Sequence, residues 1–300
     1  MMFRDAKILL CCLALIFFLQ GCAAGQITVT VTASMPSSAA APVPTATMTP
    51  LPMAVWVNGE GVLLSEYQAE LQRLEAAQAE MNIEQTPQER QKRVLDDLIA
   101  QTLLAQAAWK GGYQVTEDEL QQRVERLAER MGGAQQLAEW MAKGGYTEDS
   151  FRLALRRAMA VEWQKEQIVA AVPVALEQIH AQQILVFDAN LAQQVYNQLQ
   201  GGADFAALRW LYDPQTGGEL GWFPRGYLTR PEIEAAAFNL QPGQYTPVIQ
   251  TDFGYHIVFV VQREAQHVLT ADARRALQQK ALEEWIAARR AESQIDILVE

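Results

Sequence analysis

Two patterns of hydrophobic and polar residues divide the chain. Between residues 64 and 172 the apolar side chains recur three or four positions apart, as in the segments 67–74, 94–99 and 120–131. This spacing places them on one face of an amphipathic helix, and it predicts four or five helices. Ahead of them, apolar residues flank an Asn-Gly pair within 54–63, which predicts a short strand and turn.

Capping residues mark the expected helix boundaries. Gly111 and Gly132 are typical of helix C-termini, and Pro173 ends the last of these helices, which is expected at 151–172. In the capping box, a Ser or Thr is followed three positions later by Glu or Gln. The pattern occurs at Ser65 with Gln68, Thr86 with Glu89, and Thr116 with Glu119.

The pattern changes after residue 173. Residues 174–264 contain strand-like apolar runs, broken by Gly and Pro turns and separated by short helical segments, which predicts an α+β domain. An amphipathic helix at 270–292 and a strand at 295–300 follow. Exposed on their own they would leave an unpaired edge. We therefore expect residues 265–300 to pack on the helical domain at 53–173, with the final strand paired to residues 54–59.

The N-terminus has the features of an export signal. Arg4 and Lys7 flank an unbroken apolar run at 8–19, whose length suits a signal-peptide core and is short for a membrane span. The segment 22–52 contains no charged residue and is rich in Ala, Thr, Ser and Pro. Such a composition cannot bury a core, so we expect a disordered tether there.

Charge and residue content exclude several classes of function. The formal net charge is −11 and no run of Lys or Arg occurs, which argues against a nucleic-acid partner. All the cysteines lie within the first 22 residues, so the mature chain is expected to hold no disulfide. The histidines show no metal-ligand spacing and no Gly-rich loop opens a helix. We therefore expect neither a metal nor a cofactor.

Five segments of the α+β domain together resemble the parvulin-type peptidyl-prolyl isomerases. In chain order they are QQILVF at 182–187, GADFAAL at 202–208, GGELGWFPRG at 217–226, EIEAAAFNLQPGQ at 232–244 and PVIQTDFGYHIV at 247–258. The resemblance implies a small antiparallel sheet flanked by short helices, and an enzyme that interconverts cis and trans X-Pro bonds. Residues 174–264 contain no Ser and no Cys, which fits a reaction without a covalent intermediate.

Two further resemblances extend over the rest of the chain. Residues 53–173 are similar to the helical chaperone domain of PrsA- and SurA-like foldases, through Val-Asn-Gly at 57–59 and VLDDLIAQTLLAQAA at 94–108. LQGC at 19–22 resembles the bacterial lipobox. That resemblance implies removal of residues 1–21, a lipid on Cys22 and anchoring to the outer face of a cell membrane. A plain secretory signal and an uncleaved anchor are the alternatives.

The parvulin resemblance implies four polar site residues. His256 matches the histidine of the family's Gly-Tyr-His-Ile motif, which belongs to a hydrogen-bonded cluster, and Thr251 matches another member. Gln183 stands where the family has a first-strand histidine, and glutamine forms hydrogen bonds but does not titrate. Asp213 is the candidate for the family's Cys or Asp position before the Gly-Gly-x-Leu-Gly motif. The alternatives are a core histidine for His256 and an Asp-Pro turn for Asp213.

The family's pocket for the proline ring is apolar. The matching positions in this chain are Leu220, Leu228, Ile233 and Phe253. For Leu220 and Ile233 a role in the domain core is the alternative, because apolar residues at regular spacing fill cores as well as pockets.

These resemblances lead to one functional hypothesis and one rival. The hypothesis is an extracytoplasmic, lipid-anchored foldase that binds unfolded, proline-containing secreted polypeptides and isomerises their X-Pro bonds by a non-covalent, twisted-amide mechanism. The rival is a non-catalytic holdase chaperone that keeps a degenerate parvulin domain for peptide binding, and the glutamine at position 183 favours it. An isomerase speeds a proline-limited refolding step, whereas a holdase only suppresses aggregation.

Overall fold

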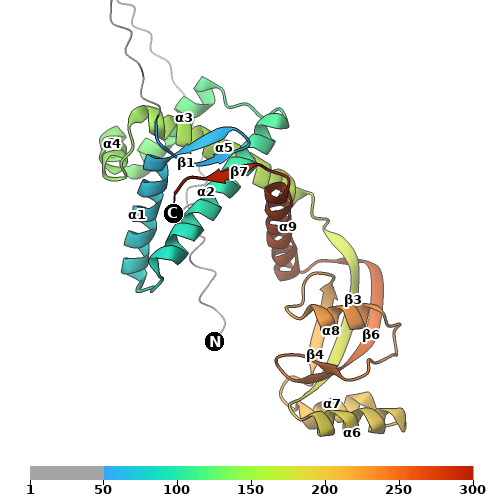
Figure 1. Cartoon of the computed structure of the whole chain (residues 1–300). Coiled ribbons are helices and arrows are strands. Elements are labelled where there is room, and N and C mark those ends of the chain that lie inside the picture. The colour runs from blue at the N-terminus through green and yellow to red at the C-terminus, as the bar shows by residue number, and fades with distance from the viewer. Residues whose placement is uncertain (1–50, 300) are drawn as a thin grey trace, which may run out of the picture. The chain divides into compact units, whose positions relative to one another are not determined.

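The computed structural model describes residues 51–299. The predicted signal segment, the tether up to residue 50 and the predicted lipidation site Cys22 lie outside the described residues. Figure 1 shows the order of the elements in the described part. No helix in that part combines the length and the hydrophobicity needed to cross a bilayer.

The first elements form a strand hairpin followed by helices. Their bounds are β1 Met53–Val57, β2 Glu60–Leu63, α1 Leu64–Met81, α2 Pro87–Lys110, α3 Glu117–Met131, α4 Ala134–Lys143 and α5 Glu148–Ala170. Asn58 and Gly59 both have positive φ angles, of 52° and 83°, as the tight turn between β1 and β2 requires. The hairpin packs on α1 and α2, where Val55, Val57 and Ile99 are fully buried.

The capping predictions are confirmed at two of three positions. The side chains of Thr86 and Thr116 cap α2 and α3, each in a complete capping box. The prediction for Ser65 is wrong: strand β2 runs directly into α1, so the N-cap is Leu63 and no side chain caps this helix. The helix expected from residue 151 begins earlier, at Glu148, because the Thr147 side chain accepts a hydrogen bond from the Ser150 N–H.

The C-terminal segment completes this helical part. Helix α9 (Ala271–Ala291) places Leu282, Trp285 and Ile286 against the core between α2 and α5. Strand β7 (Ile295–Ile297) pairs antiparallel with β1, which gives a sheet of order β2-β1-β7. The predicted pairing of the final strand with the hairpin is therefore confirmed (Figure 1).

Residues between α5 and α9 form the predicted α+β unit. Its elements are β3 Ala175–Val186, α6 Ala189–Gln200, α7 Phe205–Tyr212, β4 Glu219–Pro224, α8 Pro231–Phe238, β5 Ile249–Gln250 and β6 Tyr255–Val268. The strands make one antiparallel sheet of order β4-β3-β6-β5. The long strands β3 and β6 pair from Ala175 with Val268 to Val186 with Tyr255, so the chain enters and leaves the unit side by side.

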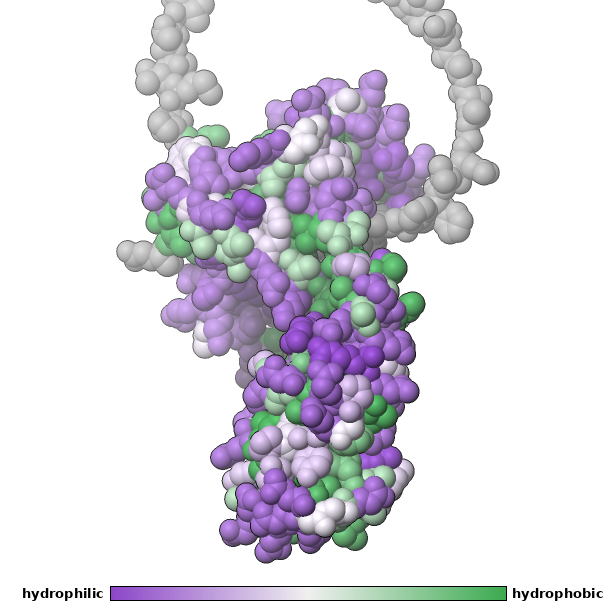
Figure 2. Space-filling view, turned by 90° about the vertical axis from the view of Figure 1, so that its right-hand side faces the viewer, coloured by the Kyte–Doolittle hydropathy of each residue, from purple (hydrophilic) through white to green (hydrophobic). Residues whose placement is uncertain are grey.

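The two faces of this sheet carry different helices. On one face, Ile184, Val186 and Ile257 pack against α6 and α7. On the other, Ala181 and Val258 pack against α8. Successive side chains of a strand point to opposite faces, so Gln183 and His256 belong to the α8 face. On the molecular face in Figure 2, hydrophobic residues lie in groups among hydrophilic ones.

Candidate functional site

The strand register brings two predicted site residues together. Leu185 of β3 pairs with His256 of β6, and Gln183 pairs with Val258. Gln183 and His256 are therefore diagonal neighbours on the α8 face, a separation that long side chains bridge. His256 is 2% exposed, so its ring is shielded from bulk water where it faces Gln183.

His256 is held from both ring nitrogens. Its Nδ1 lies 2.9 Å from Oε1 of Gln183, and its Nε2 lies 2.9 Å from the hydroxyl of Thr251. A neutral imidazole has one donor and one acceptor nitrogen. Since an amide oxygen only accepts, Nδ1–H donates to Gln183, and Nε2 accepts from the Thr251 hydroxyl. The structure thus joins three of the four predicted polar site residues in one hydrogen-bonded chain.

Burial favours the neutral form of this histidine. It lowers the pKa of His256 below the ordinary value, and the Arg230 charge lowers that pKa further, whereas Glu232 raises it. The imidazole is therefore uncharged near neutral pH, as the assigned hydrogen bonds require.

Thr251 is positioned by a tight turn between β5 and β6. The Thr251 N–H donates to the Gly254 carbonyl at 2.8 Å, and the Phe253 N–H donates to the Thr251 hydroxyl at 3.1 Å. Gly254 has a φ of 150°, and a Cβ there would lie 2.9 Å from Leu185 Cδ1 and from the Val186 carbonyl oxygen. Only glycine fits this approach of the turn to β3, and the turn aims the Thr251 hydroxyl at His256.

Apolar residues adjoin the polar chain on the same face. Val258 lies two positions after His256 on β6 and belongs to the core cluster of the α8 face. Half-buried Leu220 and Leu228 pack against that cluster. Ile233 is 4% exposed and lies within it, which corresponds to the core alternative for this residue. Leu220 and Leu228 are therefore the predicted pocket residues that remain partly exposed against the cluster of the α8 face, the face to which His256 belongs.

Glu234 positions the loop that carries Leu228, and the sequence did not single it out. Its carboxylate accepts hydrogen bonds from the N–H groups of Gly226, Tyr227 and Leu228, at 2.6, 3.0 and 3.1 Å. Charge-assisted bonds of this kind are stronger than neutral ones. The only signal in the sequence was an acidic residue in an otherwise apolar stretch at 233–238, which is also typical of a solvated helix face.

Asp213 holds a turn. It follows α7 as its C-cap, and its carboxylate accepts hydrogen bonds from Thr216, Gln215 and Gly218. The Thr216 hydroxyl, followed by the backbone N–H groups, holds the pKa of Asp213 below its usual range. These contacts correspond to the Asp-Pro turn alternative for this residue.

The turn held by Asp213 is nevertheless hydrogen-bonded to the backbone of a site residue, Gln183. The carbonyl oxygen of Gly218 accepts a hydrogen bond from the Gln183 N–H at 2.7 Å. Gly218 has a φ of +63°, and a Cβ there would collide with the carbonyl oxygen of Gln183. The turn that Asp213 holds is therefore in direct contact with the backbone of Gln183.

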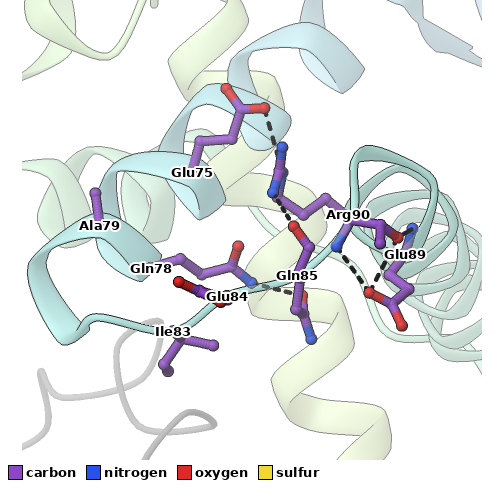
Figure 3. A pocket seen from close by; sticks show the side chains of 9 residues that line it. Glu75, Gln78, Ala79, Ile83, Glu84, Gln85, Glu89 and Arg90 are labelled. Carbon is purple, nitrogen blue, oxygen red and sulfur yellow. Dashed lines mark hydrogen bonds and ion pairs between the residues drawn. The ribbon is translucent and has the colours of Figure 1, made fainter.

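A separate hollow of about 790 Å³ lies between the end of α1 and the start of α2 (Figure 3). Its polar side chains bond one another: Gln78 donates to Gln85 at 2.6 Å, and Arg90 pairs with Glu75 at 3.3 Å. None of the predicted site residues lines it. Within residues 51–299, moreover, no three His, Cys, Asp or Glu side chains are grouped so as to hold a metal ion.

Two family models match the chain. The family described as SurA-like N-terminal domain matches residues 6–165. The family described as PPIC-type PPIASE domain matches residues 179–262, a stretch that contains Gln183, Thr251 and His256.

Curated relatives and solved structures carry related names. Foldase protein PrsA of Geobacillus kaustophilus is 32% identical over 182 residues, which cover 58% of this chain and 63% of the relative. Foldase protein PrsA of Caldanaerobacter subterraneus is 32% identical over 178 residues, covering 56% of this chain and 55% of that protein. The chain thus spans less than two thirds of the length of these relatives. A crystal structure of the peptidylprolyl isomerase PrsA from Bacillus cereus is 22% identical, covers 78% of this chain and 87% of that one, and has a TM-score of 0.46.

Proposed function

Since this chain belongs to the family of SurA-like N-terminal domain proteins, we propose that it is a foldase that isomerises X-Pro bonds in unfolded polypeptides. The isomerase is the α+β unit, with proposed bounds 174–264. The helical domain at 53–173, completed by residues 265–300, acts as the chaperone. The match to a PPIC-type PPIASE domain and the foldase names of the relatives support this proposal.

The observation that carries the proposal is the polar chain Gln183–His256–Thr251, which shares the α8 face of the sheet with partly exposed Leu220 and Leu228. Rotation about an X-Pro bond has a barrier of about 20 kcal/mol because the C–N bond is partly double. No bond has to break. An isomerase needs to hold the proline ring, exclude water from the amide and favour the twisted state over both planar states.

The residues divide these tasks. Leu220 and Leu228 provide the apolar surface for the proline ring, with Phe253 at its rim. A twisted amide has lost its conjugation, so it is less polar than the planar forms and is favoured where water is excluded. His256, fixed in its neutral form by Gln183 and Thr251, supplies oriented dipoles that need no rearrangement as the amide turns.

The test is the rate of cis-to-trans isomerisation of short X-Pro peptides by the full chain solubilised in detergent. His256→Ala should lower kcat/KM at least about tenfold, which corresponds to about 1.4 kcal/mol of barrier. His267→Ala is the matched control, because this histidine lies on the same strand, bonds to Glu264 and is outside the polar chain. If His256→Ala does not fold, Thr251→Val removes the hydroxyl partner with almost no change in volume.

A second function is favoured by two features of the site. Gln183 cannot titrate, and Ile233 lies in the core, which leaves fewer residues for a ring pocket. A holdase that only binds peptides would leave the rate of proline-limited refolding of a client unchanged while suppressing its aggregation. An isomerase would instead raise the rate of the slow, proline-limited refolding phase of the client, and His256→Ala would lose this effect.

Client binding is assigned to the helical domain. It exposes several large apolar side chains, as an unfolded chain requires of its binding surface. They are Trp56, Met81, Trp109, Trp140 and Leu153.

Anchoring through Cys22 is part of the proposal. A diacylated cysteine carries two acyl chains, enough for stable membrane attachment, and it would hold the foldase at the outer face of the cell membrane. Cys22→Ala, expressed in a bacterium with the unchanged chain as control, should move the protein from the membrane fraction and abolish labelling with a fatty acid. Continued labelling of the variant would contradict lipidation at this residue.

A further inference from the structure

The hollow between the end of α1 and the start of α2 contains a buried acceptor atom. Gln78 lines the hollow and is 4% exposed. Its Nε2 donates to Oε1 of Gln85 at 2.6 Å, whereas its own Oε1 has no hydrogen-bond partner within residues 51–299. Figure 3 shows this amide extending from α1 toward Gln85 among the lining side chains. A buried oxygen is costly to leave unpaired, so this atom indicates the point at which a ligand donates a hydrogen bond.

The charged side chains around the hollow favour a cationic ligand. The carboxylates of Glu75, Glu84 and Glu89 line it, against the single guanidinium of Arg90. The charge of Arg90 is already matched, because its Nε lies 3.3 Å from Glu75. Glu84 takes part in no ion pair and no side-chain hydrogen bond within the part of the chain that the structure describes. An anion would therefore be repelled from the hollow, and a cation would be attracted to it.

The two helix ends at the hollow have the same preference. The C-terminal end of a helix carries a partial negative charge, and no basic residue in the last turn of α1 offsets it. The N-terminal end of α2 carries the opposite partial charge, but the Glu89 carboxylate already accepts from the Thr86 N–H and hydroxyl, at 2.8 and 3.0 Å. These bonds hold the pKa of Glu89 below its usual range, so this carboxylate is charged near neutral pH.

The hollow also has an apolar wall and room for a long side chain. Ala79 and Ile83 line it beside the polar groups, and its volume is about 790 Å³. Residues 51–299 contain no group of His, Cys, Asp or Glu arranged to hold a metal ion, so an organic cation fits the lining better. A lysine side chain combines an alkyl stem, which packs on apolar surface, with an ammonium group that donates three hydrogen bonds.

We propose that this hollow binds lysine side chains of unfolded polypeptides, with Gln78 Oε1 and the Glu84 carboxylate accepting from the ammonium group and Ala79 and Ile83 packing against the stem. The inference rests on the proposed chaperone role of the helical domain, which it deepens by naming a class of client segment. A polypeptide is favoured over a free amine because Met81, the last residue of α1, is 40% exposed and offers apolar contact to residues that flank the lysine.

The experiment measures the Kd of the full chain in detergent for three blocked peptides that differ only in the central residue: lysine, norleucine or glutamate. Norleucine keeps the alkyl stem of lysine and lacks the ammonium group. The lysine peptide should bind roughly threefold to tenfold more tightly than the norleucine peptide, as expected for one partly exposed ion pair with a hydrogen bond. The glutamate peptide should bind most weakly. Glu84→Gln and Gln78→Leu should each reduce the advantage of the lysine peptide.

The matched control is Glu80→Gln. Glu80 is an exposed residue of α1 and does not line the hollow, so its substitution changes the net charge as Glu84→Gln does and should leave the lysine-to-norleucine ratio unchanged. Because Glu84 is exposed and unpaired within residues 51–299, its variant should fold even if Gln78→Leu does not. Equal Kd values for the lysine and norleucine peptides, or equal effects of Glu84→Gln and Glu80→Gln, would overturn the site.

Cadaverine, a free alkyl diamine, separates the two sources of an ammonium group. Weaker binding of cadaverine than of the lysine peptide supports a polypeptide ligand, whereas equally tight binding overturns that assignment. The chaperone role is measured apart from the site, as suppression of the aggregation of an unfolded client by the unchanged chain. Absence of suppression would contradict the chaperone role, and the comparison of the lysine and norleucine peptides would still decide the site.

Discussion

His256 is the residue at which folding and the proposed chemistry meet. Its ring needs to be neutral for Nε2 to accept from Thr251 while Nδ1–H donates to Gln183. Burial supplies this condition, since it lowers the pKa of the imidazole. The same burial gives the residue a share in stability that depends on pH.

The pH dependence follows from the sign of that shift. The unfolded chain takes up a proton on His256 below its ordinary pKa of about 6.5, whereas the folded chain resists protonation until the lower, folded pKa. The stabilisation is therefore complete above about pH 6.5 and is lost as the pH falls through the folded pKa, by at most about 1.4 kcal/mol per pH unit. Urea unfolding of the unchanged chain and of His256→Gln, from pH 8 to pH 5, measures this pH-dependent contribution of His256 to the free energy of unfolding.

The comparison with the variant isolates His256 from the other titrating groups. Burial raises the pKa of Glu66 and of Asp97, and these carboxyls act in both proteins alike. The difference in unfolding free energy between the two proteins should shrink as the pH falls. A difference that stays constant over this range would show that the folded pKa of His256 is not lowered. Isomerase activity should be flat between pH 6.5 and 8.

Secondary-structure elements place the site residues through their ends and turns. The polar chain draws Gln183 from β3 and His256 from the start of β6, and its geometry is set by the turn at 251–254 and by the turn at 213–218. Glu234 does the same for the loop that carries Leu228. In each of these supports a side-chain oxygen accepts hydrogen bonds from backbone N–H groups, so it fixes the course of the backbone that carries the site residues.

Gly218→Ala tests the support behind Gln183. The added Cβ would collide with the carbonyl oxygen of Gln183 in a left-handed backbone conformation. We expect a loss of more than about 2 kcal/mol in unfolding free energy, together with a fall in isomerase activity. Gly243→Ala is the control: its φ is +87° but a Cβ there meets nothing within 4 Å. It should cost about 1 kcal/mol, from the backbone alone. Equal losses in the two variants would mean that contact with Gln183 is unimportant.

At the scale of the whole molecule, the first and last strands of the described residues pair with each other. Strand β7, near the C-terminus, pairs with β1 near the start of the described residues, and the α+β unit is inserted between α5 and α9 through the paired strands β3 and β6. The N–H of Leu269 donates to the Val174 carbonyl at 2.9 Å, which ties the incoming and outgoing segments together. The helical domain is thus built from both ends of the described residues.

Ile295→Ala tests this closure. Ile295 of β7 packs against the core formed by the hairpin, α1 and α2, so its truncation should lower the unfolding free energy by about 1–2 kcal/mol. Ile297→Ala, two positions along the same strand and exposed, should change it by no more than about 0.5 kcal/mol. The measurement is urea unfolding of the full chain in detergent. If both variants unfold like the parent, the C-terminal strand contributes little to the domain.

The sequence alone determined the division into a helical part and an α+β part, and the edges of most helices. These features depend on local spacing: period 3.6 against period 2, and caps at fixed offsets from the helix start. The capping-box pattern wrongly predicted a helix start at Ser65. Strand β2 runs directly into α1 there, and no side chain caps the helix. The family resemblance predicted His256, Gln183 and Thr251 as site residues, because they lie in two of the segments that match the family, 182–187 and 247–258.

Only the tertiary structure decided which of the predicted residues meet. Strand register places Gln183 on Nδ1 of His256, and the turn at 251–254 places Thr251 on Nε2, whereas Asp213 is engaged by its own turn and Ile233 by the core. The contact between Gln183 and His256 joins residues 73 positions apart, and no local pattern encodes the register that brings them together. For the same reason the contact between the rings of Phe187 and Phe253 could not be predicted from the sequence, because the two residues come together only when β3 and β6 pair.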